Sequence, residues 1–155
     1  MANDLISTIL ARSRTIAVVG LSQKPERPSH GVARYLQAQG YRIVPVNPAC
    51  AGTVILGEPC YANLIEASTA LTDAGQPNID VVDCFRRADA IAPVVDDAIR
   101  IGARYVWMQI GVVNEPAAEQ ARAAGLGVVM DLCIKIEHAA WLAESRTEIK
   151  TQGAS

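Results

Sequence analysis

Short runs of apolar, β-branched residues alternate along this chain with segments of helical periodicity, and this alternation limits the folds open to it. Each run is too short for a helix and is apolar almost throughout, which is typical of a strand buried on both faces. The five runs are 16–19, 41–46, 79–85, 105–110 and 127–130. Such strands, separated by helices, form parallel sheets with right-handed crossovers. The sequence therefore predicts an α/β fold with a five-stranded, mainly parallel sheet and helices on both faces.

Helical patterns, caps and glycine stops define the segments between the strands. The expected helices cover 3–13, 29–39, 62–66, 90–101, the stretch from the Asn114 cap to Gly125, and 133–143. Ser29 is the expected N-cap of the second helix. Residues 69–78 contain Gly75 and Pro77 and predict an exposed loop. The sequence contains no linker or internal repeat. It therefore predicts a single domain, 1–155, with a core at about 13–143 and a frayed polar tail from 145 to 155.

Composition excludes several classes of function. The 155 residues are half hydrophobic, with a net charge of −2 and no run of like charges. That balance argues against a general nucleic-acid or anionic-membrane partner. The apolar runs fall far short of the roughly 20 residues that span a bilayer, and the N-terminus shows no secretory signal. We therefore expect a cytoplasmic protein; its sequence leaves open whether it forms a homo-oligomer.

The four cysteines occur singly, so they predict free thiols rather than a zinc site. Cys50 and Cys60 flank one loop, and a disulfide between them under oxidation is the alternative. Cys84 lies in a buried strand pattern and is expected to pack there.

A ligand site is expected where the strands end, because open parallel sheets bind ligands at the carboxyl ends of their strands. After the first strand, Gly20 begins a turn that leads into a polar loop and then a helix. That arrangement holds phosphate in many proteins. The loop carries Lys24, Arg27 and Ser29, while Arg86 and Arg87 follow the third strand. Arginine offers a planar fork for phosphate oxygens.

Backbone N–H groups of Ser22 and of the helix after Ser29 are expected to add neutral donors to this site. Arg87 stands next to Ala88 and Asp89 and fits a solvated surface charge better than a ligand contact.

A nicotinamide dinucleotide fits the same turn poorly. Its fingerprint requires a second glycine after Gly20 and an acid at the end of the second strand. Here Leu21 and Ser22 follow Gly20, and the second strand ends in Asn47 and Pro48. A nicotinamide-dependent oxidoreductase is therefore disfavoured.

The motifs at the strand ends, taken in order, resemble those of the stand-alone CoA-binding protein family. This is a group of small Rossmann-like proteins similar to the CoA-binding domain of succinyl-CoA synthetase α subunits. The residues that carry the resemblance are Val19-Gly20-Leu21-Ser22, Arg27-Pro28-Ser29, Tyr35-Leu36, Gly40-Tyr41, Val44-Pro45-Val46-Asn47-Pro48, Phe85-Arg86, Trp107-Met108-Gln109, Gly111-Val112 and Met130-Asp131-Leu132-Cys133. The likeness extends from about residue 13 to residue 140, nearly the whole chain.

The resemblance implies a Rossmann-like domain that binds coenzyme A or an acyl-CoA and has no assigned catalytic activity. The resemblance places Gly20, Leu21, Ser22, Arg27, Pro28 and Ser29 at the phosphates, Asn47 and Pro48 at the adenosine, Phe85 and Arg86 at the pocket wall, and Met108, Gln109, Gly111 and Val112 at the pantetheine. Lys24, because of its charge in the same loop, and Cys133, because it begins the last helix, are the other expected cofactor-binding residues. The family often has a basic residue where this chain has Leu132, although Lys135 follows nearby.

Several residues admit two interpretations. Cys133 begins a helix and either packs or forms a mixed disulfide with CoA. Asp131 is expected to cap that helix. Gln109 lies in an apolar strand and needs a hydrogen-bond partner, which a ligand would supply.

His30 and His138 are expected to be surface or hydrogen-bonded histidines, and Trp107 a core residue. The alternative functions are a CoA-linked enzyme component, either an acyl-CoA ligase partner or a CoA-disulfide redox protein, and then an NAD(P)-binding oxidoreductase.

Overall fold

The structure, a computed structural model, describes the backbone of residues 2–153 and the side chains of residues 4–147. Five parallel strands form its central sheet, in the order β2-β1-β5-β6-β7. They are β1 (Thr15–Val19), β2 (Arg42–Val46), β5 (Val81–Cys84), β6 (Tyr105–Met108) and β7 (Gly127–Val129). The α/β prediction is confirmed, and within the described residues every pairing in this sheet is parallel.

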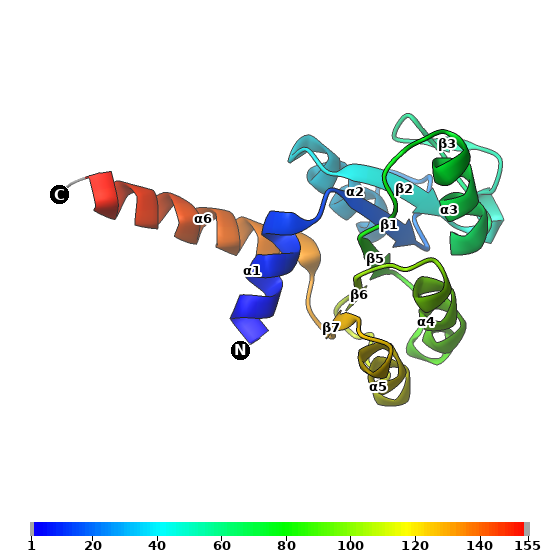
Figure 1. Cartoon of the computed structure of the whole chain (residues 1–155). Helices are drawn as coiled ribbons and strands as arrows, with labels where there is room; N and C mark the ends of the chain where they lie inside the picture. The colour runs from blue at the N-terminus through cyan, green and yellow to red at the C-terminus, as the bar shows by residue number, and fades with distance from the viewer. Residues whose placement is uncertain (1, 154–155) are drawn as a thin grey trace.

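Helices cover both faces of the sheet, as Figure 1 shows. They are α1 (Ala2–Arg12), α2 (Pro28–Ala38), α3 (Leu64–Asp73), α4 (Ile91–Arg100), α5 (Glu115–Ala123) and α6 (Ile134–Gly153). Alternating strand residues divide the core in two: Ala17 and Val19 face α3, α4 and α5. Ile16 and Val18 face α1, α2 and α6. This alternation explains why the strands are apolar throughout.

Two expected element boundaries were wrong. Helix α3 begins at Leu64 and continues to Asp73, through part of the segment expected to be a loop. Leu64, Ala67 and Leu71 are all buried, at the three- and four-residue spacing of one helical face. Burial of that face against the sheet outweighs the polar composition of the segment.

Helix α6 continues to Gly153, beyond the expected end at 143 and through the segment expected to fray. Between 143 and 153 the sequence has no proline and consists mostly of good helix formers, so nothing in it stops the helix before the glycine. In Figure 1 the far end of α6 extends away from the rest of the molecule.

The segment between β2 and α3 contains more structure than its sequence predicts. A 3₁₀ turn covers Pro48–Cys50, and the short strands β3 (Val54–Ile55) and β4 (Glu58–Pro59) pair as an antiparallel hairpin. Between β5 and α4, a second 3₁₀ turn covers Ala88–Ala90.

The strand order reverses at β1, which pairs with β2 on one side and β5 on the other. Gly20 and Phe85, the residues just after β1 and β5, lie in contact here. Gly20 has a φ of +90°, and a Cβ added to it would overlap the carbonyl oxygen of Phe85. Both the left-handed conformation and this close approach require glycine. In doubly wound sheets this reversal is where ligands bind.

Replacing Gly20 with alanine should destabilise the fold by about 2 kcal/mol or more, because left-handed strain adds to the overlap with the Phe85 backbone. Urea unfolding followed by circular dichroism measures the change.

The matched control is Gly31→Ala inside α2, where an added Cβ meets no atom within 4 Å. That change should stabilise the protein by about 0.5–1 kcal/mol. Equal effects at the two positions would show that Gly20 is not required by packing.

Candidate functional site

Three hollows lie around the carboxyl ends of β1, β2 and β5, and they share walls. The first, about 370 Å³, is bounded by the Gly20 turn, the start of α2 and Phe85. The second, about 120 Å³, lies on the α3–α4 side and includes Arg86. The third, about 490 Å³, shares Phe85 with the first hollow and Arg86 with the second. A long ligand can therefore contact all three without leaving the surface.

Side-chain clamps hold the loop after β1, which forms the first hollow. The Ser22 N–H donates to Ser29 Oγ at 3.0 Å, and the Ser22 carbonyl lies 2.8 Å from His30 Nδ1. The N-cap position of α2 is Arg27, which makes no side-chain cap bond. The prediction that Ser29 caps α2 was therefore wrong, as was the expectation that the Ser22 N–H is open to a ligand. Both groups instead fix the loop conformation.

One unpaired N–H group and several unpaired cations remain around this hollow. In the described part of the chain, the N–H group of Ser29, which lines the hollow, has no hydrogen-bond partner. Lys24, Arg27 and Arg86 make no ion pair with any described carboxylate. Lys24 and Arg27 are exposed, and Arg86 is half-buried. Positive charge that no acid neutralises, next to an unpaired N–H group, favours an anionic ligand.

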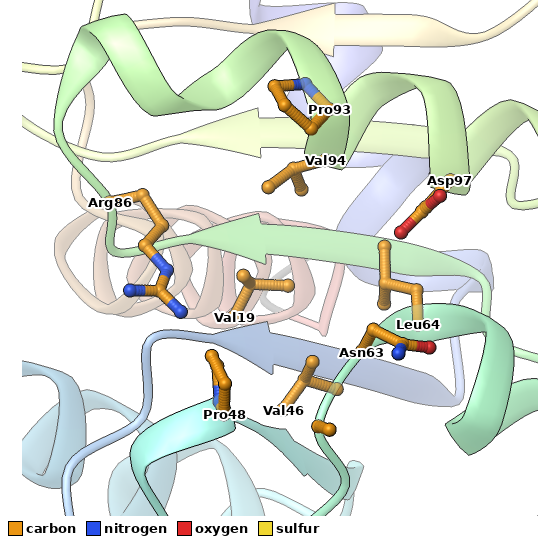
Figure 2. Close-up of a pocket in the computed structure, with 10 residues that line it drawn as sticks. Val19, Val46, Pro48, Asn63, Leu64, Arg86, Pro93, Val94 and Asp97 are labelled. Atoms are coloured by element: carbon orange, nitrogen blue, oxygen red, sulfur yellow. The ribbon is translucent and has the colours of Figure 1, made fainter.

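The second hollow is mostly apolar and has few polar groups. Figure 2 shows Val19, Val46 and Leu64 at its base and the Arg86 guanidinium extending toward Pro48. Asp97, on α4, also lines it and is half-buried. Among described side chains, none forms a hydrogen bond or ion pair with the Asp97 carboxylate. This carboxylate can accept a hydrogen bond from a ligand amine.

The third hollow has apolar walls and a polar pair beneath them. Its lining residues are Pro28, Val32, Phe85, Arg86, Arg87, Gln109, Ile110, Val112 and Cys133. Gln109 Nε2 donates to Asp83 Oδ1 at 2.6 Å. The amide nitrogen of Gln109 thus has its partner within the protein, where a ligand was expected to supply one. Arg87 is 85% exposed in its side chain and pairs with Asp89 at 2.9 Å, as expected for a surface charge.

Asp83 is the unusual residue of the site. It lies inside β5 with no exposed surface, and its Oδ2 has no hydrogen-bond partner. Burial raises the pKa of Asp83 to about 7, while the hydrogen bond from Gln109 acts in the opposite direction. The adjacent Cys84 thiol has a raised pKa because it is buried and lies next to this carboxyl. Asp83 therefore changes charge near neutral pH.

Cys133 differs from the other cysteines in its exposure. Cys50, Cys60 and Cys84 are buried, whereas Cys133 is half-exposed and lines the third hollow. All four are free thiols, as the sequence predicts. Burial raises the pKa of Cys60.

Some residues assigned by sequence do not present their side chains to the hollows. Leu21 and Met108 are fully buried in the two halves of the core. Asn47 donates to the Leu21 carbonyl at 3.0 Å and accepts from the Ala49 N–H at 3.0 Å. Its amide therefore joins the ends of β1 and β2.

Gly111 and Asp131 hold a second pair of strand ends together. The Gly111 N–H donates to Asp131 Oδ1 at 2.7 Å. Asp131 has a φ of +61° and lies before the start of α6 at Ile134. The predicted cap of α6 was therefore wrong, because the carboxylate holds the loop after β6 instead.

His138 and Trp107 have structural roles. His138 Nδ1 lies 2.8 Å from the Tyr35 hydroxyl, and burial lowers the pKa of this histidine. Trp107 is fully buried and donates to the Leu132 carbonyl at 2.8 Å. Like His30, His138 is a hydrogen-bonded histidine, and Trp107 is a core residue, as predicted.

Comparison with known proteins identifies the family. The model of the CoA binding domain matches residues 14–139. This chain belongs to the CoA-binding domain family. A relative from Bacillus subtilis, the uncharacterized protein YneT, is 41% identical over 134 residues, which is 86% of this chain and 92% of that protein.

Solved structures of two similar proteins support the same fold for this family member. A Thermus thermophilus protein, cell-free ID.343, has a TM-score of 0.80 and 31% identity, covering 91% of this chain and 99% of its own. A hypothetical protein from Pyrococcus horikoshii has a TM-score of 0.80 and 36% identity, covering 92% and 93%. In the described part of this CoA-binding family member, no helix is long and apolar enough to cross a membrane.

Sequence reasoning missed Asp83 and Asp97. Asp83 had a usable signal, because it is an acid within an apolar strand and buried charges are rare without a reason. Asp97 had none: it follows Asp96 on a helix whose pattern predicts a solvated face, and only the packing of α4 brings it to the second hollow.

The raised pKa of Asp83 predicts a specific pH dependence of stability. Between about pH 4 and pH 7 the folded state keeps a proton that the unfolded chain releases, so the free energy of unfolding falls as pH rises. Asp83→Asn removes this effect. The free energy of unfolding of the variant should equal that of the native protein below pH 4 and exceed it by up to about 4 kcal/mol above pH 7. This figure follows from 1.36 kcal/mol for each unit by which the Asp83 pKa is raised.

Urea titrations of both proteins at pH 4, 6 and 8 measure this difference. Asp73→Asn, at an exposed position, is the matched control and should show no comparable trend. A stability difference between Asp83→Asn and the native protein that stays constant from pH 4 to 8 would contradict the raised pKa.

Proposed function

We propose that this protein binds coenzyme A or an acyl-CoA and does not itself transform it. The observation that carries the proposal is the set of unpaired cations, Lys24, Arg27 and Arg86, around the point where the strand order reverses. The two hollows that they line adjoin the third hollow, whose walls are mainly apolar. Membership of the CoA-binding domain family supports the same ligand.

Each part of CoA matches one hollow in chemistry. The diphosphate suits the first, where the N–H group of Ser29 is unpaired and lies among the same lining residues as Lys24 and Arg27. The adenine suits the second, where apolar side chains can contact its ring and Asp97 can accept from its amino group. The pantetheine arm suits the third, which is mainly apolar.

A nicotinamide dinucleotide is a poorer match because of the end of β2. Dinucleotide sites place an acid there to accept from ribose hydroxyls. Here Asn47 occupies that position, and both ends of its amide are engaged with backbone groups. These bonds fix its side chain in place, and an amide lacks the carboxylate that accepts from ribose hydroxyls.

Isothermal titration calorimetry at pH 8 tests the proposal. CoA should bind more tightly than NADH, and Arg27→Ala should weaken CoA binding about tenfold or more, since hydrogen bonds to charged groups contribute about 1.5–3 kcal/mol. Arg122→Ala, on the exposed side of α5, is the control and should leave affinity unchanged. CoA binding no tighter than NADH binding would refute the proposal.

A second candidate function rests on Cys133, the half-exposed cysteine beside the third hollow. A thiol that lines the third hollow, where the pantetheine arm is proposed to lie, is placed for exchange with a CoA disulfide. In that exchange the Cys133 thiolate attacks one disulfide sulfur, a protein–CoA disulfide forms, and CoA thiolate leaves.

Incubation with CoA disulfide followed by intact-protein mass spectrometry tests this step. The native protein should gain one CoA, Cys133→Ala should gain none, and Cys60→Ala, at a buried position, should react like the native protein. Labelling of Cys133→Ala to the native extent would exclude the redox function.

A further inference from the structure

The third hollow contains one polar side chain that is buried rather than exposed. Gln109 is 5% exposed, whereas Arg86 and Arg87 reach solvent. Around it, Val32, Ile110 and Val112 provide apolar surface. A buried amide among apolar walls is the group that can orient a ligand there.

Asp83 determines which end of the Gln109 amide faces the hollow. Asp83 Oδ1 accepts the hydrogen bond from Nε2 at 2.6 Å. Above the Asp83 pKa of about 7 the carboxyl is ionised and only accepts, so the amide nitrogen faces Asp83 and the amide oxygen faces away. Gln109 Oε1 has no hydrogen-bond partner in the described part of the chain, yet it is not among the fully buried atoms that lack one. It therefore keeps some accessible surface, and Gln109 is one of the residues that line the hollow.

The cost of Asp83 indicates that this orientation matters. The carboxyl has no exposed surface, and its second oxygen is unpartnered. Leaving a buried acceptor unsatisfied costs about 1–3 kcal/mol. A neutral polar residue would fill the same space at lower cost, but it would not fix the amide of Gln109 in one orientation.

We infer that Gln109 accepts a hydrogen bond from an amide N–H in the ligand's linear arm, and that Asp83 is the positioning residue that holds Gln109 for this contact. The inference rests on the proposed function and deepens it, because a pantetheine arm contains secondary amides separated by short methylene chains. The amide N–H groups match the exposed acceptor, and the methylenes match the apolar walls.

Binding of CoA and of adenosine 3′,5′-bisphosphate, which lacks the arm, tests the inference by calorimetry at pH 8. Gln109→Met preserves length and removes the acceptor, so it should weaken CoA about five- to tenfold, the effect of one hydrogen bond. Affinity for the bisphosphate should change less than about twofold. Gln120→Met, on the exposed surface of α5, is the matched control and should alter neither.

The CoA affinity of Asp83→Asn independently tests the positioning role of Asp83. Asparagine can donate to Gln109 Oε1, which lets the amide turn and lose its acceptor toward the hollow, so CoA should bind about threefold or more weakly. Because this variant is expected to be more stable than the native protein at pH 8, weaker binding would not reflect unfolding.

The outcomes separate the inference from the proposed function. Native-like CoA affinity in Gln109→Met, or equal losses for CoA and the bisphosphate, would overturn the role of the pair while CoA binding stands. Failure of the native protein to bind CoA would overturn the proposed function and the inference with it.

Discussion

The close contact between Gly20 and the Phe85 backbone is the constraint on which the rest of this site depends. The two residues follow neighbouring strands, and their backbones meet because Gly20 has no side chain. Further bonds tie the same edge together: Gly20 donates to the Val46 carbonyl and Phe85 to the Val19 carbonyl. The loop after β1 and the arginine after β5 are thereby held against each other. A larger residue at Gly20 would separate Arg86 from the cations and the Ser29 N–H group of the loop after β1.

Asp83 shows how such a site conflicts with stability. Strand β5 is otherwise apolar, and at this position a carboxyl has one partnered and one unpartnered oxygen. A hydrophobic residue of similar size would serve the core better, since buried charges are costly unless fully paired. Local violations of folding rules are expected where a protein binds something. The unpartnered amide oxygen of Gln109, a residue that lines the third hollow, links this cost to that hollow.

The strands and most helices were predictable because periodicity reflects burial directly. The site was only partly predictable. Positions such as Lys24, Arg27 and Arg86 follow from the rule that ligands bind beyond strand ends. The partners of Ser29, Gln109 and Asp131 did not follow, because each lies in a different segment of the chain. Local sequence suggested a cap or a ligand at these positions, and tertiary contacts between loops supplied other partners. Residue type indicates that a group needs a partner but not which one it finds.

Asn47 illustrates how one such contact limits the choice of ligand. The second strand ends beside the first, so a residue there can either read a ribose or hold the turn. In this chain it holds the turn, by donating to the Leu21 carbonyl and accepting from Ala49. The loop after β1 is longer than a tight dinucleotide turn and needs this support. In the proposed CoA complex, selectivity would then depend on groups farther along the edge: the cations for phosphate, Asp97 for a base amine and Gln109 for the arm. These groups lie in three adjoining hollows, so the arrangement favours an extended ligand with several anionic groups over a compact one.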